Sequence, residues 1–204
     1  MELNDIKKTW AAYNETISDN IKLNEQLMRK MNMNSSKNEM QKILIYEVVG
    51  LIFSMFLIIM GFTYAFKFLN ELRFSLPGFV AAITTVAYLI FGLIRTKAIL
   101  NIDYFSAPVV AVQRAILELK KKTLFYRKFE IMLLPILISA IIPLLFKVVR
   151  DVDIYLEPKT LIIETAIFIG IALPATLWVN KYLYDKKFKN VESLLAELDQ
   201  FEKE

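Results

Sequence analysis

Four blocks of apolar residues alternate with polar segments along this chain of 204 residues. The blocks cover residues 43–66, 77–94, 131–146 and 160–183, and charged residues are nearly absent from them. At about 1.5 Å per residue, the first block gives a helix of roughly 36 Å, enough to cross a hydrocarbon core of about 30 Å. The pattern therefore predicts an all-α protein with four transmembrane helices in two hairpins.

Three of the polar segments carry apolar residues at spacings of three and four, which is typical of one face of an amphipathic helix. These seams are Leu3, Ile6, Trp10, Tyr13 and Ile17; Val109, Val112, Ile116 and Leu119; and Tyr184, Phe188, Val191, Leu195 and Leu198. None is long enough to form a stable helix alone in water. We expect the third and fourth spans to continue into the last two seams, and the N-terminal helix to pack against them. A docking face for another protein, anchored by Trp10, is the alternative for the first seam.

Local turn signals divide the chain further. Ser36 followed by Glu39 fits a capping box, which predicts that a new helix begins after Asn34 and Ser35. The Pro77 position predicts the start of the second span, and Ser106 is placed to cap a helix that Pro108 opens. The expected segments are a cytoplasmic N-terminal part (1–42), a first hairpin (43–94), a basic cytoplasmic part (95–130), a second hairpin (131–183) and a cytoplasmic tail (184–204).

Composition removes several classes of chemistry. Hydrophobic residues make up 56% of the chain, above the roughly 45–50% of soluble domains. The chain has no cysteine and no histidine, so it lacks thiolate chemistry and the commonest general base and metal ligand. No metal-ligand cluster or nucleotide motif is visible. We expect no enzymatic activity and no cofactor.

The positive charges predict an orientation. The segments before residue 43, between 95 and 130, and from 181 onward hold 20 of the 25 Lys and Arg residues. Because positively charged loops stay in the cytoplasm, both termini and the central segment are expected on the inner side of the membrane. The basic run at 120–122 fits attraction to anionic headgroups, without nucleic acid.

Two carboxylates, Glu47 and Glu164, lie inside the apolar blocks. An ionisable residue in a membrane span suggests proton or cation transfer. Each, however, is about one turn from a helix end, so its side chain is expected to extend to the membrane interface. The two lie on opposite sides of the bilayer and are not expected to form one site.

Three stretches, MELNDIKKTW, NIDYFSAPVVAVQRAILELKK and LLAELDQFEK, resemble an uncharacterised family of small bacterial inner-membrane proteins with paired membrane hairpins. The matching positions are Trp10, Asp103, Tyr104, Pro108, Val109 and Gln113. Members of that family are often encoded beside extracytoplasmic-function sigma factors. The resemblance implies a membrane-tethered regulator similar to an anti-sigma factor.

The leading hypothesis is an integral membrane protein whose cytoplasmic helices hold a soluble partner, with a sigma factor as the partner class. The predicted partner-binding residues are Ile6, Trp10, Tyr13, Ile17, Asp103, Tyr104, Pro108, Val109 and Gln113. One alternative is a homo-oligomeric channel or transporter subunit, in which Pro135, Pro143 and Pro174 permit bent helices around a path. Another is a structural dimer joined through the seams.

Overall fold

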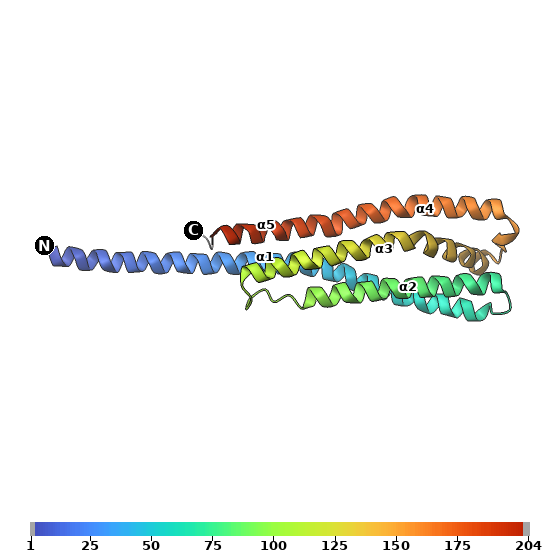
Figure 1. Ribbon diagram of the computed structural model, residues 1–204, viewed down its shortest axis with the longest axis horizontal. Coiled ribbons are helices and arrows are strands. Elements are labelled where there is room, and N and C mark those ends of the chain that lie inside the picture. Colours follow the sequence, from blue (N-terminus) through green and yellow to red (C-terminus); the bar gives the residue numbers. More distant parts are fainter. Residues whose placement is uncertain (1–2, 202–204) are drawn as a thin grey trace.

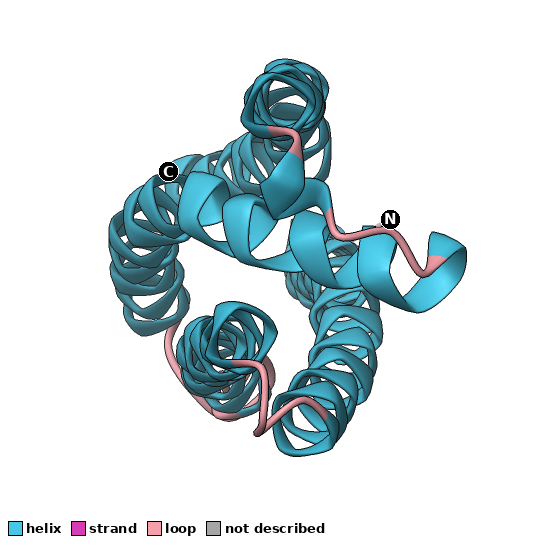
Figure 2. Ribbon diagram, turned by 90° about the vertical axis from the view of Figure 1, so that its right-hand side faces the viewer, coloured by secondary structure: helices cyan, strands magenta, loops and turns pink. Residues whose placement is uncertain are grey.

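The computed structural model describes residues 3–201, and the surroundings of the side chains at 7, 10 and 13–198. Its elements are α1 (Leu3–Lys67), α2 (Leu72–Leu100), α3 (Val109–Arg150), a short 3-10 turn η1 (Ile154–Leu156), α4 (Pro158–Asn180), a π-helical segment η2 (Lys181–Asp185) and α5 (Lys186–Phe201). No strand occurs between residues 3 and 201, so the all-α fold class is confirmed. The helices lie side by side in one elongated bundle (Figures 1 and 2).

α1 is a single helix of 65 residues, so the predicted interruption at Asn34–Ser36 is wrong. Ser36 is fully buried on the face of α1 that packs against the bundle. Glu39, the expected second member of the capping box, forms ion pairs with Lys42 and Lys187 instead. Because tertiary packing on both sides of Ser36 favours continued helix, the local capping signal does not end it.

α2 begins at Leu72, five residues before the predicted start at Pro77. Its first turn is fixed by contacts: the Phe74 ring lies 5.8 Å from the Phe68 ring and 5.5 Å from the Tyr155 ring. The Ser75 hydroxyl also donates to the carbonyl oxygen of Ala65 at 3.0 Å. Pro77 is therefore accommodated within the helix, and the link from α1 shortens to residues 68–71.

The third and fourth apolar blocks do continue into the amphipathic seams, as expected. α3 joins the central seam to the third block in 42 residues, with Pro135 and Pro143 inside it. α4, η2 and α5 follow one another without a break. The predicted Ser106 cap is wrong, because Pro108 occupies the N-cap of α3 and makes no side-chain capping bond. The backbone amide of Ser106 instead donates to Asp103 Oδ1 at 3.0 Å.

The bundle has two halves that are packed differently. In the polar half (residues 29–47, 95–123 and 184–198), one continuous core joins α1, α2, α3 and α5. Its buried members are Met33, Met40, Ile43, Ile99, Tyr104, Val109, Val112, Ile116, Leu119, Tyr184, Phe188, Val191, Leu195 and Leu198. The second and third predicted seams are therefore confirmed as core-facing.

The apolar half (residues 48–94 and 128–180) has a much smaller core, made of Ala81, Leu137 and Ala140. No residue of α4 is buried. α1 and α2 approach closely here through small residues at spacings of four, Gly61 and Ala65 on one helix and Gly78 and Ala82 on the other. A Cβ added at Gly78 would lie 2.8 Å from the Cβ of Ala65. Such small-residue crossings are typical of helices that pack within lipid.

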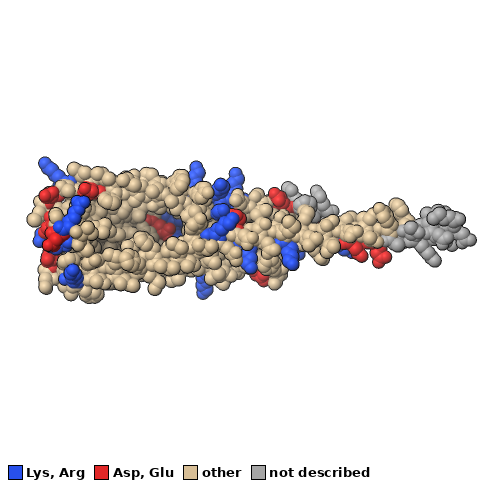
Figure 3. Space-filling model, turned by 180° about the vertical axis from the view of Figure 1, so that it is seen from behind, with Lys and Arg blue, Asp and Glu red and all other residues tan. Residues whose placement is uncertain are grey.

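The structure has four helices long and apolar enough to cross a membrane. On the face drawn in Figure 3, a broad tan band lies between charged groups at one end and charged groups near the middle of the molecule, and red and blue atoms are visible in a hollow within the band. The composition of the helix surfaces thus matches a membrane protein.

Candidate functional site

A buried ion cluster joins three helices at the boundary between the two halves. The Arg95 guanidinium, from α2, lies between carboxylates from α1 and α3. Its Nε is 2.8 Å from Glu47 Oε1, and its Nη1 donates to Glu130 Oε1 at 2.6 Å. The Arg95 and Glu47 side chains are only 8% and 3% exposed. Because charges cost least to bury when paired, each of these groups depends on the others.

Two tyrosines extend the cluster. The Tyr184 hydroxyl, in the π-helical segment η2, donates to Glu47 Oε1 at 2.6 Å. The Tyr88 hydroxyl donates to the backbone carbonyl of Glu130 at 2.7 Å. Arg127 lies over the Tyr184 ring at 5.2 Å and pairs with Asp185 at 3.0 Å. The cluster therefore connects α1, α2, α3 and η2 at one level of the bundle.

The expectation that Glu47 extends to the membrane interface is wrong, because its side chain turns inward to Arg95. Sequence reasoning did not find Arg95 and Glu130 as its partners. A signal existed: Glu47, Arg95 and Glu130 all lie at the same end of their apolar blocks. In an up-and-down helical arrangement, charges at equivalent block ends fall at one depth. Opposite signs at one depth then indicate a pair.

A cavity of about 600 Å³ opens beside the ion cluster. It is lined from all four long helical elements, including Glu47, Tyr88, Arg95 and Glu130 on the polar side. Ser54, Thr85 and Thr176 add hydroxyl groups, and the rest of the lining is apolar apart from glycine backbone. Figure 3 shows a hollow with red and blue atoms inside the otherwise tan band of the surface. Its size and mixed lining match those of small-molecule sites, which are typically about 300–1,000 Å³.

The N-terminal part of α1 extends beyond the end of α5 and beyond the loop between α2 and α3 (Figure 1). Trp10, Tyr13 and Ile17 are 65%, 63% and 40% exposed. The expectation that this seam packs against the protein's own helices is therefore wrong for these three residues. The surroundings of the Ile6 side chain lie outside what the structure describes. The alternative, a docking face, stays a prediction.

The exposed seam continues along α1 as one apolar stripe, which is separate from the residues that pack on the bundle. We call it the outer stripe, and its described members are Trp10, Tyr13, Ile17, Ile21, Met28 and Met31. Its members are 37–66% exposed. The face of α1 that packs on the bundle carries Met33, Ser36, Met40, Ile43 and Glu47. At about 100° per residue, the two stripes are roughly a third of a turn apart on the helix. Packing of α1 through Met33, Ser36 and Met40 therefore leaves most of the outer stripe exposed.

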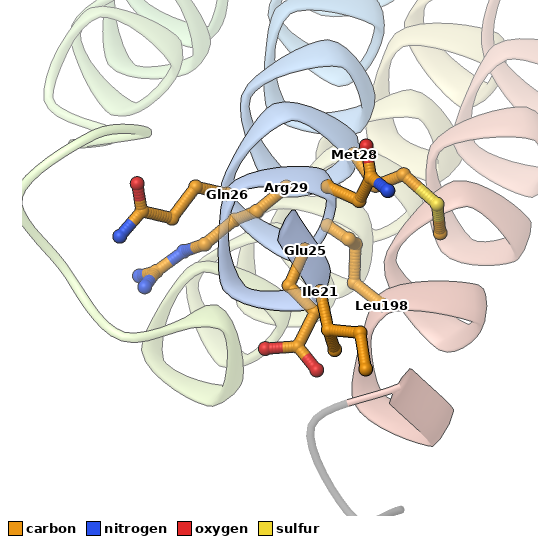
Figure 4. Close-up of a pocket in the computed structure, with 7 residues that line it drawn as sticks. Ile21, Glu25, Gln26, Met28, Arg29 and Leu198 are labelled. Carbon is orange, nitrogen blue, oxygen red and sulfur yellow. The ribbon is translucent and has the colours of Figure 1, made fainter. Parts of the chain in front are cut away.

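The outer stripe passes the end of α5 at a shallow cavity of about 340 Å³ (Figure 4). Ile21 and Met28 of α1 and Leu198 of α5 supply its apolar lining. Arg29, on the opposite side in Figure 4, donates to the carbonyl oxygen of Ala107 at 3.4 Å. This contact joins α1 to the loop between α2 and α3.

The five central residues of the predicted site have structural positions. Asp103 accepts hydrogen bonds from the amides of Ser106 and Phe105, which hold the pKa of its carboxyl below the ordinary value. Tyr104 and Val109 are buried in the core, and burial raises the pKa of the Tyr104 hydroxyl. Gln113 donates to the carbonyl oxygen of Leu195 at 2.8 Å, and Pro108 begins α3. All five residues therefore have a role in packing or in the α2–α3 loop. The structure does not place them beside Trp10 (Figure 1).

Among the described residues, no group of three or more Asp or Glu residues is arranged to hold a metal ion. Comparison of the chain with protein-family models, with curated proteins and with solved structures finds no match.

Proposed function

We propose that the protein spans the bacterial cytoplasmic membrane four times, with both termini inside, and holds a soluble protein at the membrane through the outer stripe of α1. The observation that carries the proposal is the angular separation of the two stripes on α1. One stripe packs in the bundle, whereas the members of the other remain 37–66% exposed from Trp10 to Met31, with Ile21 and Met28 bordering the cavity at the end of α5. An exposed apolar helix face of this length is stabilised in water by covering it with another protein.

The proposed orientation follows from charge. Basic residues are concentrated in the polar half, near the boundary with the apolar half, where anionic headgroups would attract them. The polar half and the projecting part of α1 then lie together in the cytoplasm. The family resemblance supplies a sigma factor as the expected partner class.

The partner is expected to bind as a helical protein with an apolar groove. The outer stripe repeats at spacings of three and four, the pattern that a groove or a second helix reads. Trp10 and Tyr13 are its largest members and are therefore the expected anchors. The charged residues of α1 between 5 and 30 are nearly balanced in sign, which fits recognition by apolar contact more than by charge.

Crosslinked capture from native membranes tests this proposal. The tagged protein is compared with a Trp10→Ala/Tyr13→Ala variant and with a Trp178→Ala/Tyr182→Ala control. The control removes the same residue types from an exposed pair on α4 and η2, whose rings lie 6.0 Å apart. We expect a soluble protein with the native chain and the control, and loss with the first variant.

The captured protein is then purified, and its affinity for the full-length chain in nanodiscs is measured. We expect the first variant to weaken binding by at least about 2 kcal/mol, as for hot-spot residues. Equal capture by all three chains would show that the outer stripe is not the partner surface. Self-crosslinked chains alone would show a homo-oligomer instead.

A further inference from the structure

The cavity beside Arg95 has an unbalanced charge. Its lining contains two carboxylates, Glu47 and Glu130, and one guanidinium. When all three are ionised, the lining carries one negative charge in excess. Arg127 also interacts electrostatically with Glu130, but it does not line the cavity and is itself paired with Asp185. In a largely apolar cavity, an unpaired charge costs free energy, and either a proton or a bound cation removes that cost.

Glu130 is the more exposed of the two carboxylates in the cavity lining. Glu47 Oε1 has both the Arg95 Nε and the Tyr184 hydroxyl within 2.8 Å. Among the described residues, the Glu130 carboxylate accepts from Arg95 Nη1 and from no second side chain. The Glu130 side chain is 20% exposed, compared with 3% for Glu47. A cation entering the cavity would therefore meet Glu130 first, beside the Tyr88 ring, whose face also attracts cations.

The space next to this charged end is apolar. A second cavity of about 670 Å³ extends from it toward the links, and Phe53, Leu57, Thr85 and Leu137 line both. Tyr64 and Thr85 bring hydroxyl groups to the lining of the second cavity, and the other side chains in that lining are hydrocarbon, aromatic or thioether groups. A ligand that fills both spaces would have one charged end and one apolar end.

We propose that the joined cavities bind a hydrophobic ammonium ion, with the ammonium group on the Glu130 carboxylate and the apolar tail between α1, α2 and α3. Neutral amphiphiles would leave the excess charge unmatched, and anionic ones would add to it. This site is separate from the outer stripe and does not depend on the proposed tethering function.

The test compares three probes that share one tail: 4-phenylbutylammonium, 4-phenylbutanol and 4-phenylbutanoate. Binding to the full-length protein in nonionic micelles is measured by equilibrium dialysis at neutral pH, with empty micelles as the reference. We expect the ammonium probe to bind at least about tenfold more tightly than the alcohol, and the carboxylate no more tightly than the alcohol. Methylammonium, which lacks the tail, should bind at least about tenfold more weakly than the phenylbutyl compound.

Glu130→Gln should abolish the preference for ammonium over alcohol while leaving binding of the alcohol unchanged. Glutamine keeps an oxygen that accepts from Arg95, so the bundle should still fold. Glu164→Gln is the matched control, because Glu164 lines a different cavity between α3 and α4. Equal binding of ammonium and alcohol by the native protein would overturn the proposal. So would tighter binding of the carboxylate, or loss of the preference in Glu164→Gln only.

Aminolipid headgroups and free amines share this ammonium chemistry. Dihexanoyl phosphatidylethanolamine is therefore added as a competitor, with dihexanoyl phosphatidylglycerol as the anionic control. Displacement of 4-phenylbutylammonium by the first lipid only would identify a lipid as the source of the ligand. Retention against both lipids, with the ammonium preference intact, would identify a free amine.

Discussion

The polar and apolar halves of the bundle show two different ways of holding helices together. In the polar half, large side chains such as Phe188, Ile116 and Met40 are buried between helices and charged residues cover the outside. In the apolar half, most large side chains are exposed, with exceptions such as Phe74 and Ile142, and glycine and alanine lie where α1 and α2 touch. Water drives apolar groups inward, whereas lipid gives them no reason to leave the surface. The amount of apolar sequence is therefore a poor guide to the amount of core.

The largest expected effect is at the ion cluster between the halves. Arg95→Gln would leave Glu47 and Glu130 facing each other without a cation, and we expect it to cost about 3–5 kcal/mol of unfolding free energy. Arg73→Gln is the control, since Arg73 is half exposed and pairs with Asp153 at the links. Reversible unfolding in mixed micelles measures both. Similar small losses in the two variants would show that the cluster does not fix the bundle.

A pair of isoleucine truncations compares the halves directly. Ile116→Ala removes a fully buried side chain from the polar-half core, and we expect a loss of about 2–4 kcal/mol. Ile167→Ala truncates a residue of α4 that is 50% exposed, and we expect a loss below about 1 kcal/mol. The same unfolding assay reports both values. If Ile167→Ala cost as much as Ile116→Ala, the outer face of α4 would be packed against another chain.

The small-residue crossing gives the next effect. Gly78→Ala would place a Cβ within 2.9 Å of the Ala65 backbone, so α1 and α2 must separate. We expect a loss of about 1–3 kcal/mol. Gly170→Ala, where no atom lies within 4 Å, should be neutral or stabilising by up to about 1 kcal/mol. A stabilising Gly78→Ala would mean that the helices do not cross as closely as described.

Much of this contrast was predictable from the sequence. Periodicity located the seams of α3 and α5, because water and lipid leave clear patterns on helices that are long and regular. The helix ends were harder. Ser36 carries a good capping signal, yet packing on both sides of it favours a continuous helix. Pro77 carries a good start signal, yet contacts of Phe74 and Ser75 begin α2 earlier.

The candidate site shows the same limit. Trp10, Tyr13 and Ile17 were identified as one face, but whether that face meets the bundle depends on its angle to Met33, Met40 and Ile43. That angle is defined only if α1 is one continuous helix, and the capping signal at Ser36 predicts two helices instead. Likewise, the position of Glu47 about one turn from a helix end predicts an interfacial side chain, whereas its partners Arg95 and Glu130 lie 48 and 83 residues away in sequence. Local patterns do not reveal pairs that only the folded bundle brings together.

The smallest expected effect is at an ion pair in the polar half, where Lys187 Nζ lies 2.8 Å from Glu39 Oε2. The hydrogen bond to Glu39 raises the pKa of Lys187. Burial by itself would raise the pKa of Glu39, but the hydrogen bonds from Lys187 and Lys42 outweigh burial and lower it. Because the pKa of Glu39 is lower in the folded protein, Glu39 stabilises the fold above its ordinary pKa of 4.5. This stabilisation is lost as the pH falls through the lowered pKa. Because the pKa of Lys187 is higher in the folded protein, Lys187 stabilises the fold below its ordinary pKa of 10.5. This stabilisation is lost as the pH rises through the raised pKa.

Lys187→Met should therefore lower stability by less than about 1 kcal/mol near neutral pH, and by progressively less in strong acid or strong base. Lys189→Met is the control, since no described residue forms an ion pair with exposed Lys189. Melting temperatures across the pH range measure both variants. High salt should remove most of the Lys187 effect, because partly exposed pairs are screened, while the Arg95 effect should persist because its cluster is buried. An Arg95 effect that vanished in salt would place that cluster in water and remove the distinction between the two halves.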